Sequence, residues 1–72
     1  MKTLQELGRE VAQLRKKQGM TQEQLGELVG MGQSTIARFE GGRVAEFGSS
    51  KLLRIFAALG RELATKKAGA PE

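Results

Sequence analysis

The sequence predicts an all-α fold of four to five helices, and three kinds of signal support that class. Apolar residues recur three and four positions apart, a spacing that places them along one face of a helix. Threonines followed three positions later by Glu or Gln mark helix starts, and glycines stand where those helices are expected to end. A chain of 72 residues is long enough for one such domain with a single core.

The first helix is expected over residues 3–18, where Thr3 and Glu6 have the spacing of a capping box. Gly19 follows at the position of a left-handed helix end. The basic run at residues 15–17 is expected to be solvated and to complement the helix dipole. The residues expected to face the core are Leu4, Leu7, Val11 and Leu14.

A second helix is predicted to begin at once, because Thr21 and Gln24 form another capping box. It ends at Gly30, where residues 30–32 supply two glycines free to adopt positive φ in a tight turn. The residues expected to face the core are Leu25, Leu28 and Val29.

The third helix is short, over residues 33–40, with Ile36 and Phe39 on its buried side and two glycines at its end. A loop then leads to Ser49 and Ser50, either of which is expected to cap a last helix closed by Gly60. The residues of this last helix expected to face the core are Leu52, Leu53, Ile55, Phe56 and Leu59.

Residues 1–64 are therefore predicted to form the folded domain. Residues 61–63 fit either a further helical turn or a short strand. Residues 65–72 have the small, basic, proline-containing composition of a flexible tail.

The composition excludes several function classes. The chain has no Cys and no His, so disulfides and zinc-finger-like sites cannot form, and neither a metal nor another cofactor is expected. No apolar run is long enough to cross a bilayer, so a soluble, cytoplasmic protein is expected. Catalysis is not expected, because general acid-base chemistry draws on His or buried carboxylates and every Glu is predicted to lie on a helix surface. The net charge of +4 makes a polyanion a plausible partner.

The most informative pattern is the joint spacing of residues across the second and third helices. Gly26 allows two helices to cross closely, and a reversal at Gly30 follows four residues later. The outer face of the third helix stays polar, as is needed to enter the major groove. The full set is Gln22, Leu25, Gly26, Val29, Gly30, Met31, Gly32, Gln33, Ser34, Ile36 and Phe39.

This set resembles the phage repressor and Cro family of helix-turn-helix domains, also called the xenobiotic-response-element (XRE) type. The resemblance covers residues 4–63 and is strongest over residues 21–34. It implies a compact lambda-repressor-like bundle whose second and third helices form the helix-turn-helix. Gly26 departs from the alanine usual in the family. The expected function is sequence-specific binding of double-stranded DNA, as a dimeric transcriptional repressor on a palindromic operator.

The resemblance also implies roles for individual residues. Gln33 would bond adenine N6 and N7, a pairing that its amide suits on chemistry alone. Ser34 would contact a base edge, and Thr35 and Arg38 lie where family members touch bases or backbone. Gln22 matches a glutamine that touches a phosphate and also braces the glutamine at the start of the third helix, here Gln33.

Further phosphate contacts are expected at the front ends of the second and fourth helices, because a helix N-terminus favours an anion. The side-chain candidates for phosphate contacts are Thr21 before the second helix, Arg43 in the loop after the third helix and Lys51 at the start of the fourth.

Two alternatives remain open. The segment from Glu46 onward resembles antitoxin members of the same family, which regulate their own operon and also bind a toxin protein. In such proteins the segment after the last helix often pairs across a homodimer, which makes Leu59, Arg61 and Leu63 candidate interface residues. A scaffold or coactivator without sequence-specific DNA contacts is the other alternative.

Overall fold

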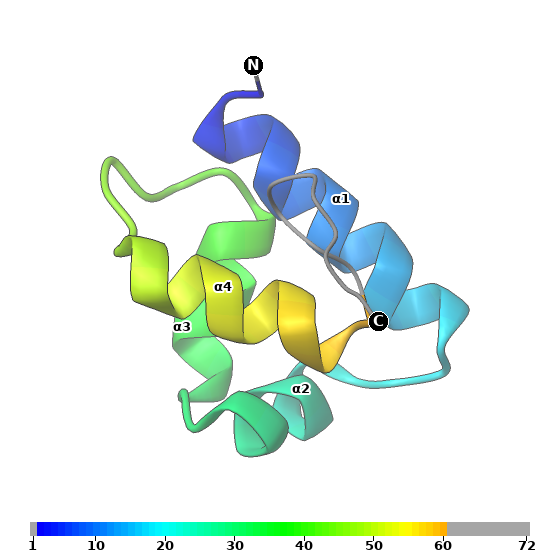
Figure 1. Cartoon of the computed structure of the whole chain (residues 1–72). Helices are drawn as coiled ribbons and strands as arrows, with labels where there is room; N and C mark the ends of the chain where they lie inside the picture. The colour runs from blue at the N-terminus through cyan, green and yellow to red at the C-terminus, as the bar shows by residue number, and fades with distance from the viewer. Residues whose placement is uncertain (1, 61–72) are drawn as a thin grey trace, which may run out of the picture.

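The computed structural model describes residues 2–60, and this part of the chain contains four α-helices and no strand. They are α1 (Leu4–Lys17), α2 (Gln22–Val29), α3 (Gln33–Glu40) and α4 (Ser49–Ala58), as Figure 1 shows. The all-helical architecture agrees with the sequence-based expectation. A fifth helix, or a strand at residues 61–63, would lie outside the described residues.

Both predicted capping boxes are present. The Thr3 hydroxyl accepts from the Glu6 N–H at 3.1 Å, and the Glu6 carboxylate accepts from the Thr3 N–H at 2.9 Å. Thr21 and Gln24 make the equivalent pair at 3.0 and 2.8 Å. These reciprocal bonds satisfy amides that the first turn leaves without partners, so they define where α1 and α2 begin.

The predicted serine cap of α4 is wrong. The N-cap residue is Gly48, and no side chain caps this helix. Ser49 and Ser50 are already the first helical residues, whereas a capping side chain must come from the extended residue that precedes them.

The turn between α2 and α3 uses one left-handed residue and not two. Gly30 ends α2 with φ of 75°, while Gly32 has φ of −70° and precedes α3 in extended backbone. The Met31 N–H donates to the Gly26 carbonyl at 2.8 Å and holds the reversal tight.

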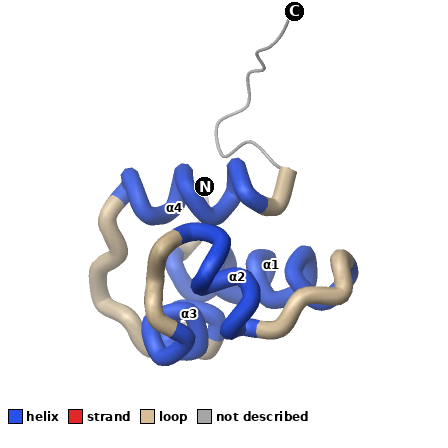
Figure 2. Tube along the Cα trace, turned by 90° about the horizontal axis from the view of Figure 1, so that it is seen from below, coloured by secondary structure: helices blue, strands red, loops and turns tan. Residues whose placement is uncertain are grey.

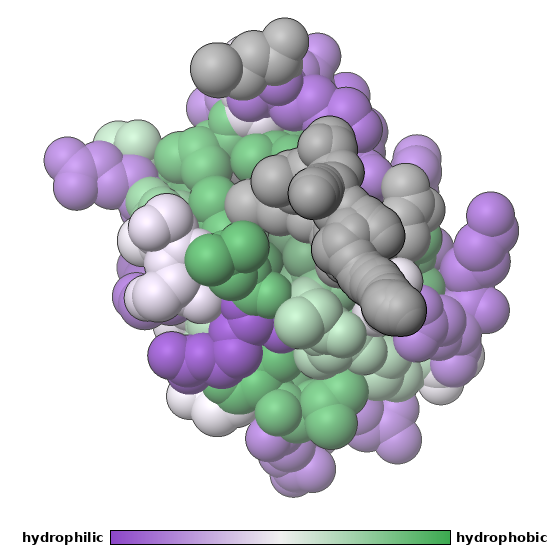
Figure 3. Space-filling model, viewed as in Figure 1, coloured by the Kyte–Doolittle hydropathy of each residue, from purple (hydrophilic) through white to green (hydrophobic). Residues whose placement is uncertain are grey.

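The four helices bury one apolar core, in which α1 and α2 pack on α3, and α4 packs on α2 (Figure 2). Two expected core residues are instead exposed: Leu28 by 60% and Leu53 by 54%. Each lies at the edge of the apolar stripe of its helix, where the side chain points away from the core. Figure 3 shows apolar side chains at the surface over α4 and α2. The buried apolar residues are Val11, Leu25, Val29, Ile36, Phe39, Leu52, Ile55, Phe56 and Leu59.

Two glycines set how closely the helices approach α3. A Cβ at Gly26 would lie 2.5 Å from the Met31 carbonyl oxygen, which supports the expected role of Gly26 in the helix crossing. A Cβ at Gly8 of α1 would lie only 2.0 Å from the Phe39 carbonyl oxygen. Because α1 touches the backbone of α3 at Gly8, the orientation of α3 is fixed from two sides.

Candidate nucleic-acid interface

The third helix has one buried face and one free face. Ile36 and Phe39 are fully buried. Gln33, Ser34 and Arg38 are exposed. The packed side holds α3 rigidly, so the exposed residues project from a fixed rod.

Thr35, the remaining predicted base-contacting residue, is only half-buried. It lies in the first turn of α3, between the exposed Ser34 and the buried Ile36. The structure therefore brings Gln33, Ser34 and Arg38 to open surface and leaves Thr35 at the boundary with the core.

A buried polar network ties three helices together behind this face. Arg15 of α1 donates from Nε to Glu40 Oε2 at 2.7 Å and from Nη2 to Glu40 Oε1 at 2.9 Å. Its third donor, Nη1, bonds the Met20 carbonyl at 2.7 Å. The pKa of Arg15 is raised, chiefly by its hydrogen bonds to Glu40, although burial acts in the opposite direction. We call Arg15, Glu40 and Gln22 the network.

This network corrects two expectations from the sequence. The side chains of Arg15 and Glu40 are only 8% and 5% exposed, so Arg15 is not part of a solvated helix end and Glu40 is not on the surface. The pair is separated by 25 positions, and no local pattern signals such a contact.

Gln22 joins the network from the first residue of α2. Its Nε2 donates to Glu40 Oε1 at 3.0 Å. The resemblance implies that Gln22 braces Gln33, whereas the side-chain hydrogen bond described for Gln22 goes to Glu40. An amide nitrogen has a second donor hydrogen, so Gln22 keeps a donor for a phosphate.

The other predicted phosphate contacts lie near α2, α3 and α4. Thr21 is exposed, and its hydroxyl accepts the capping bond from Gln24. Arg43 is exposed in the loop after α3, where its N–H donates to the Arg38 carbonyl at 2.9 Å. Lys51 lies in the first turn of α4, with its Nζ 5.5 Å from the centre of the Phe47 ring.

The predicted dimer contacts fall partly outside the described residues, since Arg61 and Leu63 are not among them. Leu59 is 3% exposed and packs in the core of its own chain. Its carbonyl accepts from Gln18 Nε2 at 2.8 Å. The Leu59 side chain thus has almost no surface left for a second subunit.

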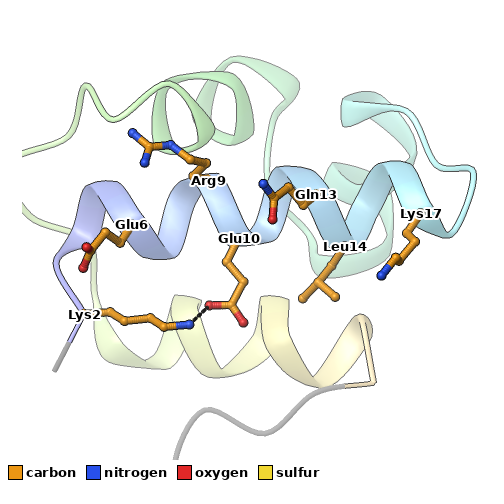
Figure 4. A pocket seen from close by; sticks show the side chains of 7 residues that line it. All are labelled: Lys2, Glu6, Arg9, Glu10, Gln13, Leu14 and Lys17. Carbon is orange, nitrogen blue, oxygen red and sulfur yellow. Dashed lines mark hydrogen bonds and ion pairs between the residues drawn. The ribbon is translucent and has the colours of Figure 1, made fainter.

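A shallow hollow of about 390 Å³ runs along α1 (Figure 4). It is lined by side chains of both charges, with an ion pair between Lys2 and Glu10. None of the predicted DNA-contacting residues lines it. The lining residues are Lys2, Glu6, Arg9, Glu10, Gln13, Leu14 and Lys17.

The geometry of α2 and α3, a tight turn with the second helix half-exposed, defines a helix-turn-helix protein. A family model described as a helix-turn-helix domain matches residues 6–67, and the chain belongs to this family. Helix-turn-helix domains place their second helix in the major groove of DNA, so DNA is the partner that fold and family indicate. The search of curated proteins finds no match. Among the described helices, none is long and apolar enough to cross a membrane.

Proposed function

We propose that the protein is a sequence-specific transcriptional repressor of the phage repressor and Cro (XRE) type. It binds double-stranded DNA as a dimer on a palindromic operator, with α3 in the major groove. The observation that supports this best is the exposure of Gln33, Ser34 and Arg38 on a helix that is anchored in the core by two fully buried residues. The proposed role is binding without catalysis or a cofactor, in the cytoplasm.

Gln33 is the proposed main base contact. It is the first residue of α3, and the first turn of a recognition helix is the part that reaches base edges. Its amide offers one donor and one acceptor, which match N6 and N7 of adenine. Ser34, beside it, has a hydroxyl that bonds either kind of base-edge group.

The charge around α3 suits a phosphate backbone. Arg38, Arg43 and Lys51 are exposed cations on α3 and on the chain that follows it. Glu40, the one acid within α3, is engaged by Arg15 and almost fully buried. Because α3 exposes almost no negative charge, the positive electrostatic field of the three cations reaches solvent little diminished by this helix. This field favours association with DNA.

A dimer suits a domain of this size, because one α3 contacts few base pairs and a second copy doubles the site. In such dimers the half-sites lie about 34 Å apart. Since Leu59 is committed to its own core, we place the proposed subunit contact in Arg61 and Leu63. Occupation of the operator would then block transcription.

One observation favours a second candidate function, an antitoxin that regulates its own operon. Leu28 and Leu53 are large apolar side chains exposed by more than half, and exposed apolar surface marks sites for protein partners. A toxin protein is the partner this candidate requires. Co-purification of a toxin encoded by a neighbouring reading frame, lost in Leu53→Glu, would favour it.

The experiment that tests the main proposal is selection of bound duplexes from a random DNA pool, followed by titration of variants. Gln33→Ala should weaken binding to the selected sequence by about 1–3 kcal/mol and leave binding to random DNA nearly unchanged. Gln13→Ala, an exposed glutamine on α1, is the matched control and should change neither. Equal loss on both DNAs, or no enriched sequence, would contradict base recognition by α3.

A further inference from the structure

Phe47 connects the core of α3 to a cation on α4. Its ring stacks on that of Phe39 with centroids 4.3 Å apart and planes 6° apart. Phe39 is fully buried, and Phe47 is half-buried in the loop between α3 and α4. The stack fixes the loop to the recognition helix, because the Phe39 ring cannot move without disturbing the core.

A lysine side chain also lies near the Phe47 ring. Lys51 Nζ lies over the Phe47 ring, 5.5 Å from its centre. A cation within about 6 Å of a ring centroid is attracted by the negative ring face. No ion pair of Lys51 is found within the described residues, and its side chain is otherwise exposed.

We infer that Phe47 is a positioning residue for DNA binding, which holds the Lys51 ammonium beside α3 for a backbone phosphate. This inference rests on the proposed function. The ring attracts the ammonium without a conventional hydrogen-bond acceptor, so the donors that point away from the ring stay available for phosphate oxygens. A lysine already held in place loses less side-chain freedom on binding than a free one.

The effect should be independent of sequence, because phosphate contacts position a protein on DNA without distinguishing bases. Phe47→Leu keeps an apolar side chain and removes the ring. We expect it to weaken binding to the selected operator and to random DNA alike, by about two- to fivefold. Phe47→Tyr retains a ring with a negative face and should restore wild-type affinity.

A double-mutant cycle separates positioning from plain loop stability. Phe47→Leu, Lys51→Met and the double variant are titrated with both DNAs, and the thermal midpoint of each is measured. If Phe47 acts through Lys51, Phe47→Leu has no further effect once Lys51→Met is present. Lys17→Met, an exposed lysine on α1, controls for the loss of one charge.

Two outcomes overturn the inference alone. Either Phe47→Leu binds like the wild type, or it weakens binding equally with and without Lys51, which would show that it acts by packing. Retention of no duplex by the wild-type chain would instead overturn the proposed function, and this inference with it.

Discussion

Arg15 and Glu40 form a bidentate ion pair, with contacts of 2.7 and 2.9 Å, that links α1 to the last residue of α3. The pair is buried, and Glu40 also accepts from Gln22 of α2. Both partners lie away from the exposed face of α3, yet they determine how that helix is held. The network therefore makes the recognition helix depend on α1 and α2 together.

Loss of one partner should be far more harmful than loss of both. Glu40→Ala leaves the Arg15 charge buried and unpaired, and should lower the free energy of unfolding by about 3–5 kcal/mol. Arg15→Met with Glu40→Met removes both charges and should be closer to the wild type. Urea denaturation followed by circular dichroism measures both. Glu27→Ala, at an exposed glutamate on α2, is the control.

Two results would contradict this account: Glu40→Ala as stable as the control, or a double variant no more stable than the single one.

The contribution of Arg15 to the free energy of unfolding should not change over the ordinary pH range. Its pKa is raised, so its contribution is present below the normal arginine pKa and is lost only above it.

Much of the fold could be predicted because its signals are local. Capping boxes at Thr3 and Thr21 depend on residues three apart, and the structure contains both. The bounds of α3 follow from glycines on either side. The prediction that Leu28 and Leu53 face the core was wrong. Periodicity shows where the apolar stripe of a helix runs but not how much of it is buried, because the buried width depends on which helix packs against it.

The candidate site likewise has features that local sequence predicts and features that depend on contacts between distant residues. Ser34 is exposed because it lies on the side of α3 opposite Ile36, and Gln33 is exposed as the first residue of the helix. Arg15, Glu40 and Gly8 could not be identified, because their importance arises from contacts across 25 or more positions. From the sequence alone, Arg15 beside two lysines has the pattern of a solvated helix end, and only the contact with Glu40 shows that it is buried.

Gly8 should not tolerate even one added methyl group. In Gly8→Ala the new Cβ would meet the Phe39 carbonyl oxygen at 2.0 Å, and backbone cannot move aside as a flexible side chain does. We expect a loss of about 1–3 kcal/mol in stability, although alanine favours a helix over glycine. Gln13→Ala in the same helix should be close to neutral. A thermal midpoint for Gly8→Ala at or above the wild type would show that α1 and α3 have room to separate.

The exposed leucine of α2 should be replaceable where its buried neighbour is not. Leu28→Gln alters a side chain that is 60% exposed and should change stability by no more than about 0.5 kcal/mol. Leu25→Ala removes a fully buried side chain and should cost about 2–5 kcal/mol. Similar losses from both would mean that Leu28 is covered in solution, for example by a second copy, and sedimentation would then detect that copy.

Salt dependence should separate phosphate contacts from base contacts on the proposed interface. The logarithm of affinity falls with that of salt in proportion to the number of phosphates neutralised. Arg43→Met should therefore reduce this slope by about 1 and weaken binding to operator and random DNA alike. Gln33→Ala should leave the slope unchanged, because an uncharged amide releases no counterion. The slopes come from fluorescence anisotropy titrations at several salt concentrations. A slope unaltered by Arg43→Met would remove Arg43 from the interface, since an exposed cation that touches a phosphate cannot be lost without changing the counterions released.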